Sequence, residues 1–243
     1  MPNSVISDTE TVAALKQRVL GGKPFSYVRF GDADLLFMDD PEFKGNKRHS
    51  KSAPLSRELR EAFAIKHDDW LIGCIGGGKA HNKSHQRAMD DLANRITGGE
   101  ETFYSAVGIM TAYMQRPDEF IDFCKSCFVD RSVAFVAGPG VAGSALVNKV
   151  LSVDATIKLT DRNAYRVLDD KYPAILDAAK QHAIMIVALG QAGRVLAKRL
   201  WHDHRDIQLI DIGSIVDALA RRNLRSWIGR YSHRVDEYEK VWA

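Results

Sequence analysis

The sequence has few cysteines and no long apolar run. Among its 243 residues the cysteines are Cys74, Cys124 and Cys127, too few for the disulfide framework of a small secreted domain. A helix that crosses a bilayer needs about 20 consecutive apolar residues, and no stretch of the sequence approaches that length. The N-terminal residues are polar and lack the basic and apolar regions of a signal peptide. We therefore expect a cytoplasmic protein with no membrane span.

Two of the cysteines, Cys124 and Cys127, have the Cys-x-x-Cys spacing of zinc and redox sites. No second pair of Cys or His residues at zinc-site spacing lies near them. Residues 118–128 have a helical pattern, and residues three apart on a helix share a face. We therefore expect both thiols to be buried in the core.

The chain also lacks a strong excess of charge of one sign. Its 34 Lys and Arg residues against 31 Asp and Glu residues give a net charge of +3. This allows attraction to phosphates but does not require a nucleic-acid partner. The most basic loop, residues 44–51, includes Lys47 and Arg48, with Phe43 beside it. It is either a solvated loop or an acceptor site for an anionic substrate such as a nucleic acid or a lipid phosphate.

Short apolar runs alternate with helical patterns along the sequence. We expect strands at residues 25–29, 70–75, 132–137, 155–159, 184–189 and 207–212. We expect helices at residues 9–20, from 32, 54–66, 84–96, 100–114, 118–128, 141–151, 172–182, 191–201 and 214–222. Such alternation is typical of a parallel sheet with helices on both faces. The prediction is a single α/β, Rossmann-like domain over residues 1–243, with residues 223–243 as a C-terminal tail that packs on the domain or covers its site.

The first expected strand runs into Gly31 and then two carboxylates, Asp32 and Asp34. Ligands of parallel sheets bind at the carboxyl ends of strands. Two carboxylates one residue apart suit a hard divalent cation that keeps room for substrate phosphates. Asp34 is the more direct candidate ligand, with Asp32 on the metal or a ribose, and the alternative is a solvated turn with a helix cap. Arg29 either contacts a phosphate or locks the turn through an ion pair with one of these carboxylates.

Two glycine-rich turns follow later strands. Residues 138–143 read Gly-x-Gly-x-x-Gly, and residues 190–193 repeat Gly-x-x-Gly. Such turns point N–H groups at anions, and the first pattern is that of a dinucleotide site for NAD or S-adenosylmethionine. However, the strand after it ends without a clear acidic residue, and close packing of helix on sheet explains the glycines equally well. We favour the second turn for phosphate because Arg194 adds a positive charge.

Other polar residues lie near expected strand ends. The run Gly76-Gly77-Gly78 is followed by Lys79, His81 and His85 but lacks the Walker Lys-Ser/Thr ending. These three side chains are candidates for an acceptor or phosphate contact or for a solvated face, and His81 and His85, four residues apart, are also candidates for a metal site. Asp211 ends a strand and is a candidate general base, ribose ligand or helix cap. Asn163 and Tyr165 either contact a nucleotide or order their loop.

Several of these segments resemble motifs of the GT-D glycosyltransferases. Residues 29–34 are similar to the family's Arg-Phe-Gly-Asp-Gly-Glu signature, and residues 163–165 to its Asn-Ala-aromatic element. Residues 188–197 and 210–213 resemble its Ala-Leu-Gly-Pro-Thr-Ala…Leu-Ala and Ile-Asp-Ile-Gly-His segments. The departures are Ala33-Asp34 for Gly-Glu, Gln191-Ala192 for Pro-Thr, and Ser214 for His.

The resemblance implies a metal-dependent transferase that moves a sugar from a UDP-linked donor to a hydroxyl on a glycan, protein, lipid or modified DNA base. The implied cofactor is Mn²⁺ or Mg²⁺ on Asp32 and Asp34, with Asp34 and Asp211 as catalytic residues. The candidate donor-site residues are Arg29, Gly31, Asp32, Asn163, Gly190, Gln191, Arg194 and Ser214. The candidate acceptor-site residues are Lys79, His81, His85, Lys47 and Arg48. The alternatives are an enzyme that binds NAD or S-adenosylmethionine at residues 138–143, and a non-catalytic nucleic-acid-binding module.

Overall fold

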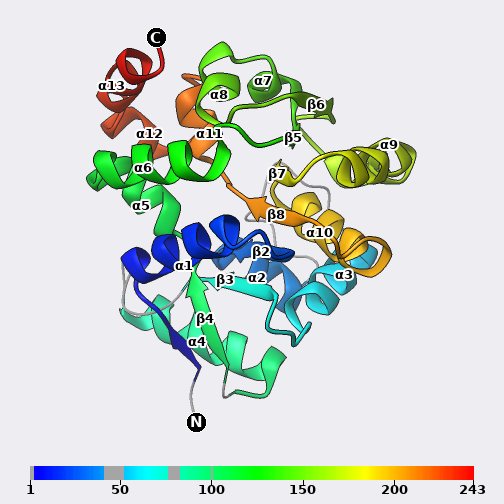
Figure 1. Cartoon of the computed structure of the whole chain (residues 1–243). Helices are drawn as coiled ribbons and strands as arrows, with labels where there is room; N and C mark the ends of the chain where they lie inside the picture. Colours follow the sequence, from blue (N-terminus) through cyan, green and yellow to red (C-terminus); the bar gives the residue numbers. More distant parts are fainter. Residues whose placement is uncertain (1–2, 41–51, 76–82, 100) are drawn as a thin grey trace.

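The computed structural model of the chain describes residues 3–40, 52–75, 83–99 and 101–243 (Figure 1). One eight-stranded sheet has the order β1-β4-β3-β2-β8-β7-β5-β6, and its neighbouring strands pair in parallel. The strands are β1 (Ser4–Val5), β2 (Phe25–Phe30), β3 (Trp70–Cys74), β4 (Thr102–Ser105), β5 (Val133–Ala137), β6 (Ala155–Lys158), β7 (Ile184–Ala188) and β8 (Gln208–Asp211). This confirms the predicted α/β class.

Helices connect the strands. They are α1 (Asp8–Leu20), α2 (Asp32–Asp39), α3 (Ala53–Phe63), α4 (Lys83–Thr97), α5 (Gly108–Gln115), α6 (Pro117–Phe128), α7 (Pro139–Ala142), α8 (Ala145–Val150), the 3₁₀ helix η1 (Ala164–Val167), α9 (Leu168–Gln181), α10 (Gln191–Asp203), α11 (Ile215–Leu219), α12 (Ser226–Arg230) and α13 (His233–Val241). No helix in these described ranges is long and apolar enough to cross a bilayer.

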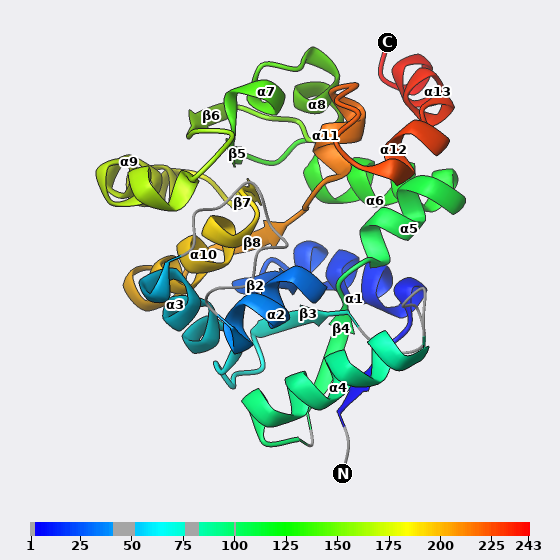
Figure 2. The ribbon, with the colours of Figure 1, turned by 180° about the vertical axis from the view of Figure 1, so that it is seen from behind.

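The helices cover both faces of the sheet, because successive strand residues point to opposite sides. On β2, Tyr27 belongs to a core with α1, α5, α6, α8 and α11, whereas Val28 belongs to a core with α2, α3, α4, α9 and α10. In Figure 1 α1 lies in front of the strands, and from behind, in Figure 2, α2 and α4 lie in front. Cys124 and Cys127 are fully buried in the first of these cores, as predicted.

The site is positioned where two neighbouring strands send the chain to opposite faces. Strand β2 pairs with β8, with Tyr27 opposite Ile210. The chain leaves β2 into α2 on one face and leaves β8 towards α11 on the other. Adjacent parallel strands that diverge in this way leave a crevice at their carboxyl ends, where α/β proteins bind ligands.

The structure corrects three expectations about elements. The single helix expected over residues 100–114 is instead strand β4 followed by α5, because Thr102, Phe103 and Tyr104 suit a strand, and β4 pairs with β1 on one side and β3 on the other. The helix expected over residues 141–151 is two helices, with Ser144 capping the second through Val147 N. The short strand β1 was missed because its two residues carry too little pattern.

The C-terminal tail, residues 223–243, contains α12 and α13 and packs against α5 and α6. The Tyr238 hydroxyl donates to the carbonyl of Tyr113 at 2.7 Å, and its ring contacts Phe120. Ile228 of α12 is buried in the same core. Of the two expectations for the tail, the structure shows packing.

Candidate active site

Four charged residues lie together at the carboxyl ends of β2 and β8, where Arg29 joins the other three through its backbone. Arg29 is the residue before the last of β2, Asp34 lies on the first turn of α2, Arg194 on the first turn of α10, and Asp211 ends β8. We call these four residues the central cluster. Its members are separated by up to 182 positions in the sequence, and it includes both predicted catalytic carboxylates.

Helix α2 begins directly after β2 and fixes the direction of its two carboxylates. Asp34 folds back onto the start of the helix, where its Oδ2 accepts from Gly31 N at 2.9 Å. The Oδ1 of Asp32 accepts from Ala33 N at 2.8 Å, and this residue is exposed. Both carboxylates are favoured by the positive end of the helix dipole. Asp34 therefore faces the interior of the site and Asp32 faces its exterior.

Arg194 joins the two buried carboxylates. Its Nη2 lies 3.2 Å from Asp34 Oδ2 and its Nη1 lies 3.5 Å from Asp211 Oδ2. Its Nε donates to the carbonyl of Arg29 at 2.5 Å. Burial by itself would lower the pKa of Arg194, but the carboxylates of Asp211 and Asp34 outweigh burial and raise that pKa above its ordinary value. Arg194 is therefore a permanent cation, with only 10% of its side chain exposed.

Arg29 fastens two loops to the end of β2. Its Nε donates to Ala106 O at 2.5 Å and its Nη1 to Ile212 O at 2.9 Å. The guanidinium lies against Gly213, where an added Cβ would come within 1.6 Å of Nη1 and where φ is +68°. Arg29 makes no ion pair with Asp32 or Asp34, which was one of the two alternatives for it, because Arg194 pairs with Asp34 instead. Arg29 locks the turn through backbone carbonyls, and its contact with a phosphate stays a prediction.

Asp211 is the most buried member of the cluster, with 2% of its side chain exposed. Its Oδ1 accepts from Gly213 N at 3.1 Å, and its Oδ2 faces both Arg29 N and Arg194. The carboxylate therefore orders the turn after β8, which leads to Ser214, the N-cap residue of α11. Proton abstraction by Asp211 would require it to leave these partners, so the geometry suits a positioning role better.

The start of α10 carries a polar side chain for which the described residues provide no hydrogen-bond partner. Gly190, the N-cap residue of α10, has a positive φ of 58°, which favours glycine. Gln191, the first residue of α10, is 1% exposed. Neither atom of its side-chain amide has a hydrogen-bond partner among the described residues. Because buried polar groups are nearly always satisfied, an orphaned amide here calls for an explanation, and a ligand is one.

The Asn163 segment is held in place by a second charged network. The Tyr165 hydroxyl donates to Glu58 at 2.7 Å, and Glu58 also pairs with Lys198 and Arg199 of α10 at 3.0 Å. Burial would raise the pKa of Glu58, but the hydrogen bonds from Arg199, Tyr165 and Lys198 lower it to about 2. Of the two readings of Tyr165, the structure therefore shows loop ordering. The role of Glu58 could not be predicted from the sequence, because its own segment does not indicate hydrogen-bond partners that lie more than 100 residues away.

The first glycine-rich turn, residues 138–143, is occupied by the protein itself. Asp161 Oδ1 accepts from Gly140 N at 3.3 Å, and both its oxygens lie 3.2 Å from the guanidinium of Arg222. An added Cβ on Gly138 would come within 2.1 Å of Asp161. The position that a cofactor phosphate would take in a dinucleotide site is therefore filled by a carboxylate of the chain.

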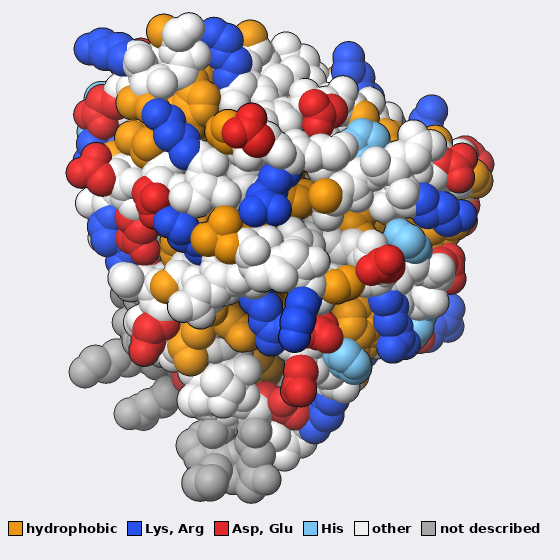
Figure 3. Space-filling model, in the orientation of Figure 1, with side chains coloured by type: hydrophobic (Ala, Val, Ile, Leu, Met, Phe, Trp, Pro, Cys, Tyr) orange, Lys and Arg blue, Asp and Glu red, His pale blue; other side chains and the backbone are white. Residues whose placement is uncertain are grey.

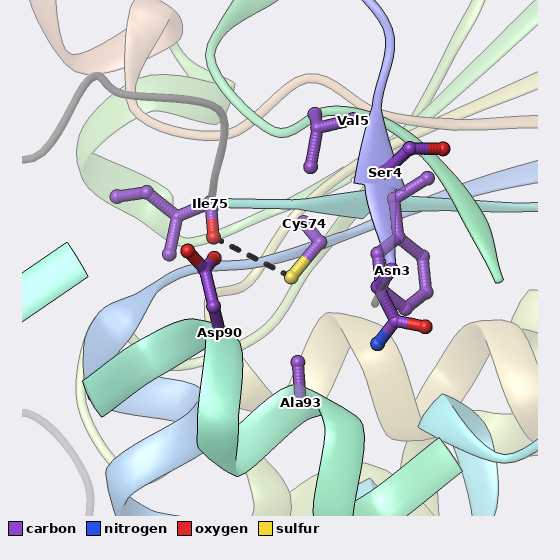
Figure 4. Close-up of a pocket in the computed structure, with 8 residues that line it drawn as sticks. Asn3, Ser4, Val5, Cys74, Ile75, Asp90 and Ala93 are labelled. Atoms are coloured by element: carbon purple, nitrogen blue, oxygen red, sulfur yellow. Dashed lines mark hydrogen bonds between the residues drawn. The ribbon is translucent and has the colours of Figure 1, made fainter. Parts of the chain in front are cut away.

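The residues predicted for the acceptor lie mostly outside the described part of the chain. Lys79, His81, Lys47 and Arg48 are outside the described residues, and so is the side chain of His85. A separate cavity of about 220 Å³ lies between α4 and strands β1, β3 and β4 (Figure 4). It is lined by Asn3, Ser4, Val5, Cys74, Ile75, Asp90, Ala93 and Phe103. No member of the central cluster lines it, so the two features are distinct.

The oxygen ligands in the site suit a metal ion that binds together with a phosphate-containing substrate. Across the described residues, no group of three or more His, Cys, Asp or Glu side chains could hold a metal ion. The carboxylates of Asp34 and Asp32 are oxygen donors of the kind that Mg²⁺ and Mn²⁺ take, and such ions complete their shells with substrate phosphates and water. The chemistry of these two residues therefore fits a cation bound together with a diphosphate, although Asp34 faces inward and Asp32 outward, so that one carboxylate must turn before both can hold the same ion.

Comparison with known proteins identifies the family and the fold of the chain. The family model described as the glycosyltransferase GT-D fold matches residues 27–219. The chain is similar to a solved structure described as a new glycosyltransferase (DUF1792) from Streptococcus sanguinis, with 19% identity, a TM-score of 0.71, and coverage of 88% of this chain and 82% of that one.

A second solved structure, described as the highly conserved domain of unknown function 1792 with a distinct glycosyltransferase fold, has 17% identity and a TM-score of 0.70. The similarity covers 89% of this chain and 80% of the solved chain. A comparison with curated proteins finds no match. The matched region, 27–219, contains the whole central cluster, and the chain belongs to the family of glycosyltransferases with the GT-D fold.

Proposed function

We propose that the chain transfers a sugar from a UDP-linked donor to a hydroxyl acceptor, with a divalent cation on Asp32 and Asp34. The observation that carries this proposal is the central cluster at the diverging ends of β2 and β8. Its two buried carboxylates, Asp34 and Asp211, share the guanidinium of Arg194, a buried charge arrangement that costs desolvation and is concentrated at functional sites. A hydroxyl on a glycan, protein, lipid or modified DNA base would serve as the acceptor.

The donor would lie along the carboxyl ends of β2, β8 and β7. The start of α10 at Gly190 offers N–H groups and a helix dipole to the diphosphate. The orphaned amide of Gln191 offers one donor and one acceptor, which match the imide edge of a uracil or a ribose hydroxyl. Asn163, with a left-handed backbone at the start of η1, lies on the same edge of the sheet.

The residues of the cluster would divide the work. Asp34 and Asp32 would hold the cation, which when bound acts as a Lewis acid on the departing diphosphate. Arg29 and Asp211 hold the loops after β4 and β8 in place around the donor, and the Arg194 guanidinium fixes the distance between β2, α2 and β8. These contacts supply pre-organisation, which enzymes need for sugar transfer as for other group transfers.

The alternatives receive less support. Asp161 occupies the turn that would bind NAD or S-adenosylmethionine. On the face shown in Figure 3, acidic and basic side chains are interspersed and form no extended basic surface. Non-specific binding of nucleic acids relies on such a surface.

The test is ligand binding measured by thermal shift and titration calorimetry. UDP, UDP-glucose, NAD and S-adenosylmethionine are each added with and without Mn²⁺ to the wild type and to Asp34→Asn. We expect UDP compounds to stabilise the wild type only with Mn²⁺, and Asp34→Asn to abolish the effect. The matched control is Asp122→Asn, which removes a carboxylate paired with Lys16 at the surface. Metal-independent stabilisation by NAD or S-adenosylmethionine would sink the proposal.

A further inference from the structure

Arg194 occupies a position between two carboxylates that a cation would otherwise neutralise. It contacts Asp34 and Asp211 at once, and all three side chains are at most 10% exposed. Arginine stays charged under any ordinary condition, so this neutralisation cannot be removed by pH. Both contacts of Asp34, with Gly31 N and with Arg194, use its Oδ2. The predicted metal ligand is thus already paired with a positive charge.

The charge of the whole cluster supports the same conclusion. Asp34 and Asp211 carry two negative charges, Arg194 pairs with both, and the partly buried guanidinium of Arg29 adds a second positive charge at the end of β2. A divalent cation added to this group gains little, because its attraction to the carboxylates is offset by repulsion from the guanidinium that already pairs with them. A diphosphate brings additional negative charge and changes that balance.

We infer that Arg194 is a built-in counter-cation that competes with the divalent cation for Asp34, so that the metal binds tightly only together with the diphosphate of the donor. This inference rests on the proposed function, because it takes Asp34 as a metal ligand. Arg194 is then a positioning residue that sets the order of binding. Without a donor it holds Asp34 in its inward position and keeps the site free of adventitious metal.

The experiment measures Mn²⁺ affinity without any nucleotide, by electron paramagnetic resonance of free Mn²⁺ and by thermal unfolding with and without MnCl₂. Arg194→Gln removes the charge and is expected to bind Mn²⁺ at least about tenfold more tightly than the wild type, a change of about one unit in log Kd. Its melting temperature is also expected to rise with Mn²⁺ more than that of the wild type. The double variant D34N/R194Q should lose both gains.

The matched control is Lys198→Gln. Lys198 lies one turn further along α10, is also buried, and pairs with Glu58 and Glu61 rather than with the cluster. It is expected to leave Mn²⁺ affinity at the wild-type level. A folded Arg194→Gln protein, verified by circular dichroism, with wild-type Mn²⁺ affinity would overturn the inference, as would a gain that persists in D34N/R194Q.

Arg194→Lys guards against a failure to fold. It keeps one positive charge, but an ammonium is a point charge and cannot reproduce the two-sided contact of the guanidinium. We expect an intermediate gain in Mn²⁺ affinity, and wild-type affinity in this folded variant would also overturn the inference. UDP binding to the wild type in the presence of Mn²⁺ tests the proposed function separately. Its absence would sink the transferase proposal, whereas the nucleotide-free titration judges the role of Arg194.

Discussion

Two glycine-rich turns end the neighbouring strands β5 and β7, yet the protein uses them differently. The turn at Gly190 leads into α10, which carries Arg194 into the buried central cluster. The turn at Gly138 is closed by Asp161 and Arg222, whose side chains are 38% and 26% exposed. The same local pattern thus contributes to the central cluster after β7, whereas after β5 it is covered by side chains of the protein itself. The difference comes from partners distant in sequence, and it predicts different costs of mutation.

The largest difference is expected for glycine substitutions. Gly213→Ala places a methyl group 1.6 Å from Arg29 and forces alanine into a left-handed conformation. We expect a loss of about 3 kcal/mol or more in the free energy of unfolding, measured by urea denaturation. Gly140→Ala meets Arg222 at 1.9 Å, but this long side chain near the surface can move away. We expect about 1 kcal/mol or less there.

Gly22→Ala separates the two causes of the Gly213 effect. Gly22 has the same φ of +68° but no atom within 4 Å of an added Cβ. It reports the backbone cost alone, about 1 kcal/mol. Equal losses for Gly213→Ala and Gly22→Ala would show that Arg29 yields easily and would remove the contrast between Gly213, in the turn after β8, and Gly140, in the Gly138 turn.

The next difference concerns the two arginines. Arg29→Met removes two charge-assisted hydrogen bonds to backbone carbonyls and should cost about 2–3 kcal/mol of unfolding free energy. Arg222→Met removes a solvent-accessible pair with Asp161 and should cost no more than about 1 kcal/mol. Both values come from chemical denaturation at neutral pH. A larger loss at Arg222 would mean that the Gly138 turn is held more tightly than the loops after β4 and β8 that Arg29 binds.

Glu58 connects the segment after β6 with the helix that follows the Gly190 turn. It accepts from Tyr165 of η1 and pairs with Lys198 of α10. Its pKa falls from the ordinary 4.5 to about 2 in the folded chain, so its stabilisation is present above about pH 4.5 and is lost as the pH falls towards 2. Glu58→Gln should cost on the order of 2 kcal/mol at pH 7. The gap from the wild type should narrow between pH 4.5 and 2, as followed by urea unfolding at several pH values. The control, Glu61→Gln, alters a carboxylate that is 51% exposed and should change little.

The smallest effect on stability is expected at Gln191. Replacement by leucine removes an unpartnered buried amide, so the free energy of unfolding should stay the same or rise by up to about 1 kcal/mol. UDP affinity, measured by calorimetry with Mn²⁺, should fall. A marked loss of stability without any change in UDP binding would show that the amide serves the fold and not the ligand.

The sequence predicted the class of the fold well because the strands and helices have clear local patterns. The apolar runs of β5 and β7 are fully or nearly fully buried, as parallel strands are. The prediction was wrong at residues 100–114, where a helix was expected but residues 102–105 form a strand that pairs with β1 and β3. Secondary structure of this kind depends on a neighbour that the local pattern does not reveal.

The site could be predicted only in part. Motif positions placed Arg29, Asp34, Arg194 and Asp211 correctly at strand ends and helix starts. Their pairing could not be read, because Arg194 and Asp34 are 160 positions apart and either arginine could have neutralised the carboxylate. The same holds for Asp161, whose capture of the Gly138 turn needs Arg222 from a distant loop. Residue types were visible in the sequence, whereas contacts required the fold.

The pairing of β2 with β8 also has a consequence for synthesis of the chain on the ribosome. Tyr27 lies opposite Ile210, so β2 waits for a strand that is translated much later than itself. Until α10 and β8 have emerged, Asp34 lacks its guanidinium partner and the β2 edge next to β8 is exposed. Contacts of such long sequence separation form late in folding. A nascent chain thus carries the Arg29–Asp34 signature long before it has a site, and the central cluster is assembled only after β8 has left the ribosome.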